Sequence, residues 1–257
     1  MNNVSMIFSD DLQAAAEAAV KNICYSIDMR VVIVATHSAI NERWRRAISG
    51  LGNAYTIAVV RGSVKEKDKA IRSNARIIFA SPGSAGRILT AKGIKADVLI
   101  VDDLEGLVKI RKEFRNNISA LAHNTAQIIG INCSLNGENL RYLPEILRIM
   151  GMEEIKGMPL SGFYERYYFR DYLRKDKFTI CRLELKPGAV EAVKRVLGET
   201  CDMQLINKAD TKDMDVSGYE EYIPLDYKEK SRYGFMKWIR EEKAYGKCIG
   251  NYNDQYV

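Results

Sequence analysis

Val98-Leu99-Ile100-Val101-Asp102-Asp103 decides the fold class, because four consecutive apolar residues, three of them β-branched, lead directly into two carboxylates. A short run that is apolar on both faces is typical of a strand buried in a parallel sheet that helices cover on both sides. Similar runs lie before and after it, at Val31 to Ala35, Tyr55 to Val60, Ile77 to Ala80 and Gln127 to Ile131.

Segments in which apolar residues recur at helical spacing separate these runs. They lie at Leu12 to Ile27, Ala39 to Ile48, Lys65 to Arg72, Ala85 to Leu89 and Leu107 to Ala122. Strands that alternate with helices along the chain indicate an α/β fold in which a doubly wound parallel sheet has helices on both faces. We expect this core to occupy residues 1–150.

The sequence changes character after residue 150. We expect an α-rich extension over residues 151–245, packed on the core, with one helix after Lys186-Pro187-Gly188 and another from Tyr227 to Ala244. The polar residues 246–257 are expected to form a loose tail. Aromatic and arginine side chains crowd Ser161 to Tyr172; they could stack on single-stranded bases, but their helical spacing favours packing on the core.

Composition excludes several classes of site. The five cysteines show no Cys-x-x-Cys spacing and the chain has two histidines, so we expect no metal site. No apolar run reaches the roughly 18 residues of a membrane span, and the N-terminus does not resemble a secretory signal. We therefore expect a cytoplasmic protein with no membrane partner. The net charge of +6 suits a polyanionic partner, and equally a basic soluble surface.

Chemically distinctive residues stand at the ends of the expected strands. Asp102-Asp103 has the shape of a Walker B motif, in which the first acid helps to hold magnesium and the second orients the attacking water. The other strand ends carry four such segments: Thr36-His37-Ser38, followed by Trp44-Arg45-Arg46; Arg61-Gly62-Ser63; Ser81-Pro82-Gly83-Ser84, followed by Arg87; and Asn132-Cys133-Ser134.

In this order the segments resemble the first RecA-like domain of a phage-type Swi/Snf superfamily-two (DEAD/DEAH-like) helicase. Ser81 to Arg87 is similar to the Thr-Pro-Gly-Arg-Leu segment of those proteins, and Asn132-Cys133-Ser134 looks like their motif three without its Thr-Pro. Lys186-Pro187-Gly188 resembles a segment of phage members. The resemblance implies a RecA-like, P-loop NTPase-type architecture that covers nearly the whole chain.

The resemblance also implies loops that contact a nucleic-acid backbone. The alternative for each loop is a plain strand–turn–helix junction or a solvated helix face. The residues implied in backbone contact are Thr36, His37, Ser38, Arg45, Arg61, Ser81, Pro82, Gly83, Ser84 and Arg87.

The ATP-binding motifs depart from the family pattern. Leu12-Gln13-Ala14 commonly follows Gly-Lys-Thr in the family, and this register places Asp10 at the lysine and Asp11 at the threonine. Two carboxylates would repel a triphosphate. Asp103 stands where the family has Glu, and the second RecA-like domain would lie beyond this chain. We therefore expect neither ATP nor magnesium to bind, and interpret both acid pairs as helix caps.

The resulting hypothesis is a non-catalytic nucleic-acid-binding protein that acts as an accessory factor in phage or mobile-element DNA metabolism. DNA is favoured over RNA as its partner, together with a polymerase, a helicase or another replication or transcription protein. One alternative is a protein-interaction module that mimics or completes a helicase complex. A second alternative is a divergent ATPase that another chain completes.

Overall fold

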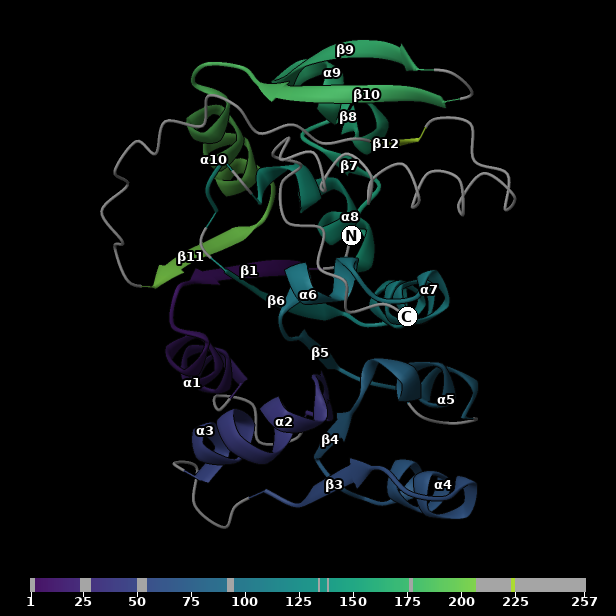
Figure 1. Cartoon of the computed structure of the whole chain (residues 1–257). Helices are drawn as coiled ribbons and strands as arrows, with labels where there is room; N and C mark the ends of the chain where they lie inside the picture. The colour runs from purple at the N-terminus through teal and green to yellow at the C-terminus, as the bar shows by residue number, and fades with distance from the viewer. Residues whose placement is uncertain are drawn as a thin grey trace.

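A seven-stranded parallel sheet forms the centre of the computed structural model (Figure 1). The structure describes residues 3–23, 29–49, 55–91, 95–133, 135–137, 139–175, 178–206 and 223–224. The strand order is β11-β1-β6-β5-β2-β4-β3, and every neighbouring pair is parallel. The strands are β1 (Asn3–Ser9), β2 (Val31–Val34), β3 (Ile57–Val60), β4 (Ile77–Ala80), β5 (Val98–Val101), β6 (Gln127–Asn132) and β11 (Asp202–Ile206).

Helices cover both faces of the sheet, which confirms the predicted doubly wound α/β class. One face packs against α1 (Leu12–Ile23), α2 (His37–Ala39), the π-helical turn η1 (Ile40–Trp44) and α3 (Arg45–Ser49). The other face packs against α4 (Val64–Arg72), η3 (Pro82–Ser84), α5 (Ala85–Thr90), α6 (Leu104–Val108), α7 (Lys112–His123), η4 (Leu140–Tyr142) and α8 (Leu143–Ile149).

Of the strands predicted from apolar runs, β2, β4, β5 and β6 are buried at their centres, whereas β3 at the edge of the sheet is only partly covered and its Ile57 is 48% exposed. Val98, Leu99, Ile100 and Val101 each have 0% of their surface exposed, as expected for a strand with helices on both sides. The structure adds β1 and β11, which the apolar runs did not reveal. Because β11 pairs with β1 from Ser5↔Asp202 to Ser9↔Ile206, the sheet draws its edge strand from beyond residue 150.

The extension contains more strand than expected. It holds β7 (Glu154–Ile155), β8 (Met158–Pro159), η5 (Leu160–Gly162), α9 (Phe163–Tyr167), β9 (Tyr168–Lys175), β10 (Phe178–Leu185), α10 (Ala189–Thr200) and β12 (Ile223–Pro224). The helical spacing predicted through Tyr172 ends at Tyr167, because β9 pairs with β10 over eight residues in an antiparallel hairpin.

The predicted packing of the aromatic residues holds for part of the cluster, because Phe169 and Tyr172 are 55% and 52% exposed. Phe163, Tyr167 and Tyr168 are buried in the same apolar cluster as residues of the central sheet, and the rings of Phe163 and Tyr167 lie 4.9 Å apart. The predicted helix after Lys186-Pro187-Gly188 is α10, which begins after Gly188 in the left-handed region (φ 72°). The helix predicted from Tyr227 to Ala244 and the tail 246–257 lie outside the described residues.

Within the described part of the chain, no helix is long and apolar enough to cross a membrane.

Candidate functional site

The ends of the strands divide the carboxyl edge of the sheet into two halves. In the first half, Val101 of β5 aligns with Gly130 of β6, and Phe8 of β1 aligns with Asn132 of β6. The residues that follow these strands, which include Asp10 and Asp102 at the ATP-motif positions, therefore lie near one another. In the second half, Val34 of β2 aligns with Ala80 of β4, and Ala80 aligns with Val60 of β3. Ligands of open parallel sheets bind at this edge.

Asp11 closes the first turn of α1. Its Oδ1 accepts hydrogen bonds from the backbone N–H groups of Gln13 (2.8 Å) and Ala14 (3.2 Å). The backbone N–H of Asp11 in turn donates to Ser9 Oγ (3.0 Å), which fixes the turn between β1 and α1. The helix-cap interpretation is thus confirmed for Asp11, whereas Asp10 is exposed on the same turn.

This turn does not suit a triphosphate. A phosphate at a helix N-terminus needs the free N–H groups of the first turn, and here a carboxylate already accepts two of them. The turn from Ser9 to Leu12 carries two acids and no glycine or lysine. Its charge and its hydrogen bonding both oppose the binding of ATP phosphates.

Asp102 has a different role from the helix cap that the sequence suggested. It is 2% exposed, and its Oδ2 accepts from Arg43 Nη2 at 2.5 Å and from Trp44 Nε1 at 2.8 Å. Burial raises the pKa of the Asp102 carboxyl, and the contact with Arg43 opposes that rise. The cap interpretation is therefore wrong for Asp102, which forms a buried ion pair.

The π-helical turn η1 makes this ion pair possible. In Ile40–Trp44 the backbone hydrogen bonds join residues five apart and not four apart as in an α-helix. The angle around the helix axis between neighbouring side chains therefore differs from that of an α-helix. Arg43 and Trp44, which are adjacent in sequence, both reach the same carboxylate oxygen. No local signal in the sequence reveals that Arg43 has a partner 59 residues away.

Asp103 and Asn132 both stabilise α6. Asp103 adopts the left-handed conformation (φ 51°, ψ 60°) and its side chain accepts from the backbone N–H of Gly106, which confirms the cap interpretation for this residue. Asn132 is fully buried, and its Oδ1 accepts from the backbone N–H of Glu105 at 2.9 Å. The motif-three position therefore ties β6 to α6.

Cys133 follows Asn132 and is half-buried beside acidic residues. Burial raises the pKa of its thiol, and the negative charges of Glu105 and Asp103 raise it further. Both effects favour the protonated thiol over the thiolate. Ser134 lies outside the described residues.

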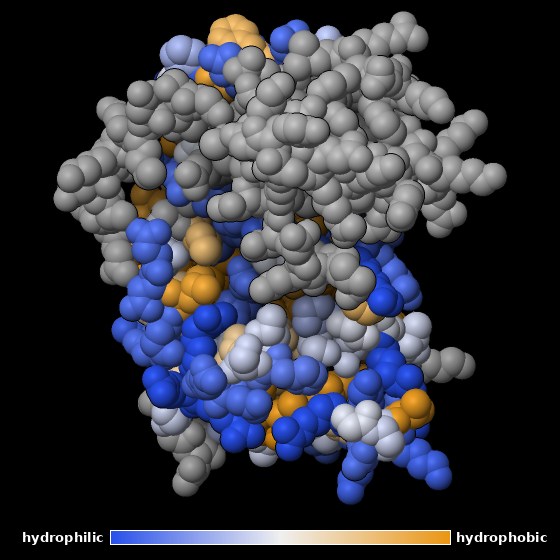
Figure 2. Space-filling view, viewed as in Figure 1, coloured by the Kyte–Doolittle hydropathy of each residue, from blue (hydrophilic) through white to orange (hydrophobic). Residues whose placement is uncertain are grey.

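The second half of the edge gathers part of the predicted nucleic-acid contacts. The segments that follow β2, β4 and β3 begin at neighbouring strand ends, so Thr36, Ser81 and Arg61 lie on the same side of the sheet. Thr36, His37, Ser38, Arg61 and Gly83 are exposed, while Ser81 and Pro82 are half-buried. The face over α2 to α4 in Figure 2 is mostly hydrophilic.

Three of the predicted contact residues are placed differently. Ser84 is 3% exposed and its hydroxyl accepts from Ser81 Oγ at 3.1 Å, so it is enclosed in its own turn. Arg87 forms an ion pair with Asp68 at 3.1 Å. Arg45 is exposed but lies about two helical turns beyond Thr36, away from the strand ends.

Comparisons with solved structures identify the fold. The SWI2/SNF2 ATPase core of Sulfolobus solfataricus in complex with dsDNA is 14% identical, with a TM-score of 0.51 over 79% of this chain and 40% of that one. A hypothetical ATP-dependent RNA helicase from Sulfolobus tokodaii is 16% identical, with a TM-score of 0.46 over 61% of this chain and 46% of that one. No family model and no curated protein matches the sequence.

The chain thus spans less than half of the length of these two solved helicases. At this level of identity the likeness establishes the fold alone, which is the RecA-like α/β fold.

Proposed function

We propose that this chain is a helicase-like module that binds nucleic acid, DNA in preference to RNA, without hydrolysing ATP. It acts as an accessory factor in the DNA metabolism of a phage or another mobile element. The phage assignment rests on the resemblance of Lys186-Pro187-Gly188 to a segment of phage Swi/Snf-like proteins.

The observation that carries the non-catalytic part is the cap that Asp11 places on α1. The Asp11 carboxylate accepts from the Gln13 and Ala14 N–H groups, where a nucleotide phosphate would have to bind. A second feature agrees with it: Asp102, which stands at the magnesium-ligand position of the Walker B pattern, is bound by Arg43 and Trp44. Together they disfavour both the phosphate and its metal.

The nucleic-acid part rests on the opposite half of the edge. Thr36, Ser81 and Arg61 stand at neighbouring strand ends and carry hydroxyl, backbone and guanidinium groups of the kind that bind phosphodiesters. Thr36 and Arg61 are exposed and Ser81 is half-buried, and the Thr36 hydroxyl also accepts from the Ala39 N–H at 3.3 Å. The similar SWI2/SNF2 core was solved in complex with dsDNA, which supports DNA as the polymer. The fold of this chain is similar to that of the DNA-bound SWI2/SNF2 core, which supports a nucleic-acid role for the loops after β2, β3 and β4.

Salt-dependent binding tests this proposal. Fluorescence anisotropy with a labelled DNA duplex and an RNA duplex of equal length should give tighter binding to DNA, with an affinity that falls steeply between about 50 and 200 mM salt. The variant Arg61→Glu should weaken binding at least about tenfold, since it removes a cation and adds an anion at the edge. No binding to either duplex refutes the proposal.

Lys21→Glu is the matched control. Lys21 is exposed in the last turn of α1, at the opposite edge of the sheet from Arg61, and the substitution changes the charge by the same amount. DNA affinity that falls equally in both variants would indicate a general charge effect and would contradict a site at the carboxyl edge.

A further inference from the structure

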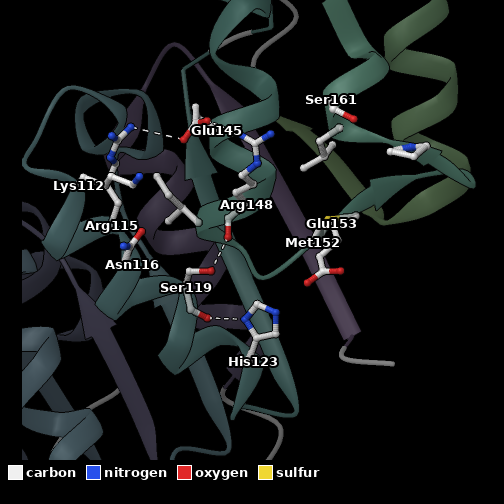
Figure 3. A pocket seen from close by; sticks show the side chains of 13 residues that line it. Lys112, Arg115, Asn116, Ser119, His123, Glu145, Arg148, Met152, Glu153 and Ser161 are labelled. Carbon is white, nitrogen blue, oxygen red and sulfur yellow. Dashed lines mark hydrogen bonds and ion pairs between the residues drawn. The ribbon is translucent and has the colours of Figure 1, made fainter. Parts of the chain in front are cut away.

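A groove lies over α7 and α8, on one face of the sheet and away from its carboxyl edge. Its walls are α7 and the segment from Met152 to Ser161, its floor is α8, and its volume is about 590 Å³ (Figure 3). This is within the range of about 300–1,000 Å³ that is typical of ligand-binding pockets. None of the residues predicted to contact nucleic acid lines it.

Charged side chains stand on both walls of the groove. Lys112 and Arg115 come from α7, while Glu153 comes from the opposite wall (Figure 3). On the floor, Glu145 forms ion pairs with Arg115 (3.5 Å) and with Arg148. Three cations against two carboxylates leave a small positive excess.

One cation and one amide remain available to a ligand. Lys112 and Asn116 are exposed on α7, and neither side chain forms an ion pair or hydrogen bond with any described residue. An ammonium group suits a carboxylate, and a carboxamide both donates and accepts, as a peptide backbone does. Ion pairing of Glu145 with two arginines leaves Lys112 as the cation that an acidic group would meet.

The remaining lining of the groove is mixed: Ser119, His123 and Ser161 are polar, and Met152 and Pro159 supply its accessible apolar surface. Ile149 and Leu160 are buried beside Met152, a flexible side chain that adapts to different partners. The groove follows α7 from Lys112 to His123, a distance of about 16 Å at 1.5 Å per residue. Four or five residues of an extended chain cover that distance at about 3.3 Å each.

We propose that this groove binds an extended segment of a partner protein that carries an acidic side chain and, next to it, an aliphatic one. The acidic group pairs with Lys112, the aliphatic group packs on Met152 and Pro159, and Asn116 bonds the backbone of the segment. The groove lies over α7 and α8, away from the carboxyl edge of the sheet, so this inference does not depend on nucleic-acid binding at that edge.

Fluorescence anisotropy with the full chain tests this inference. The probes are fluorescein-labelled pentapeptides in which Asp or Glu lies one to three positions from Leu or Met, compared with the same peptides carrying Asn or Gln. Acidic peptides should bind, and their amide counterparts should bind at least about tenfold more weakly. Lys112→Glu should weaken the acidic peptides by a similar factor and should strengthen a peptide with Lys in place of the acid.

Lys21→Glu again serves as the control, because it makes the same charge change on a helix of the other sheet face. Equal losses in the two variants would overturn the inference. The inference would also be overturned if no peptide bound. It would likewise be overturned if a DNA duplex displaced the peptides and bound more weakly to Lys112→Glu than to the native chain. An aliphatic-to-Ser change in the peptide should also weaken binding; unchanged affinity contradicts the apolar contact.

Discussion

The guanidinium of Arg43 lies 2.5 Å from the carboxylate of Asp102, and the indole N–H of Trp44 donates to the same oxygen at 2.8 Å. The Asp102 side chain is 1% exposed, so within the described residues Arg43 and Trp44 are the partners of its Oδ2, while its Oδ1 is buried without a hydrogen bond. A residue that stands at a metal-ligand position of the helicase pattern thereby holds η1 against the end of β5.

Arg43→Ala should destabilise the protein strongly. The substitution leaves the buried Asp102 carboxylate without its cation, and breaking one side of a buried ion pair costs about 3–5 kcal/mol. Urea unfolding followed by circular dichroism measures the change. Arg45→Ala, two residues along on an exposed position, should change the free energy of unfolding by about 0.5 kcal/mol or less. Equal effects of both variants would contradict the buried pair.

The stability of the protein should depend on pH through Asp102. Burial raises the folded-state pKa of this carboxyl above its unfolded value, so its stabilising contribution is complete below the unfolded pKa and is lost as pH rises through the folded pKa. Asp102→Asn does not titrate. The free energy of unfolding of the native protein, relative to Asp102→Asn, should therefore decrease from pH 4 towards neutral pH. An increase over that range would show that Arg43 outweighs burial.

Asp11 should contribute to stability as a hydrogen-bond acceptor. Asp11→Ala removes the acceptor of the Gln13 and Ala14 N–H groups and should cost about 1 kcal/mol, measured by chemical unfolding. Asp11→Asn keeps a good N-cap without the charge and should cost only a few tenths of that amount. A full loss in Asp11→Asn would mean that charge, and not the cap geometry, stabilises the turn.

Asn132 should matter for stability through its bond to α6. Asn132→Ala leaves the Glu105 N–H without its acceptor and empties space around a fully buried side chain, which should cost about 1–3 kcal/mol. Thermal unfolding reports the loss. Cys133→Ala, the next residue, is half-buried and should change stability less. The reverse order would contradict the role assigned to Asn132.

Much of the fold was predictable because β2 to β6 are short apolar runs, and for β2, β4, β5 and β6 burial on both faces of the sheet accounts for that pattern. β1 was missed because Ser5 interrupts its apolar run. β11 was missed because its residues Asp202 to Ile206 alternate, as an edge strand does, and its partner β1 lies far away in sequence. Periodicity carries no information about pairing at that distance.

The site was predictable only where the chemistry is local. The caps of Asp11 and Asp103 act on residues two or three positions ahead, so their sequence context contains the signal. The Arg43–Asp102 contact joins residues 59 apart and depends on the π-helical turn, which no residue pattern announces. The change from helix to strand at Tyr168 likewise depends on β10, because aromatic residues suit both structures.

The central claim, nucleic-acid binding without an ATP cycle, is tested most directly by measuring DNA affinity with and without magnesium and ATP. The affinity of a labelled duplex should be the same in buffer and in about 1 mM magnesium–ATP, because a ligand that does not bind cannot change the affinity of another. No DNA-stimulated release of phosphate should accompany it. A shift in DNA affinity on adding magnesium–ATP, or phosphate release that depends on DNA, would contradict the account.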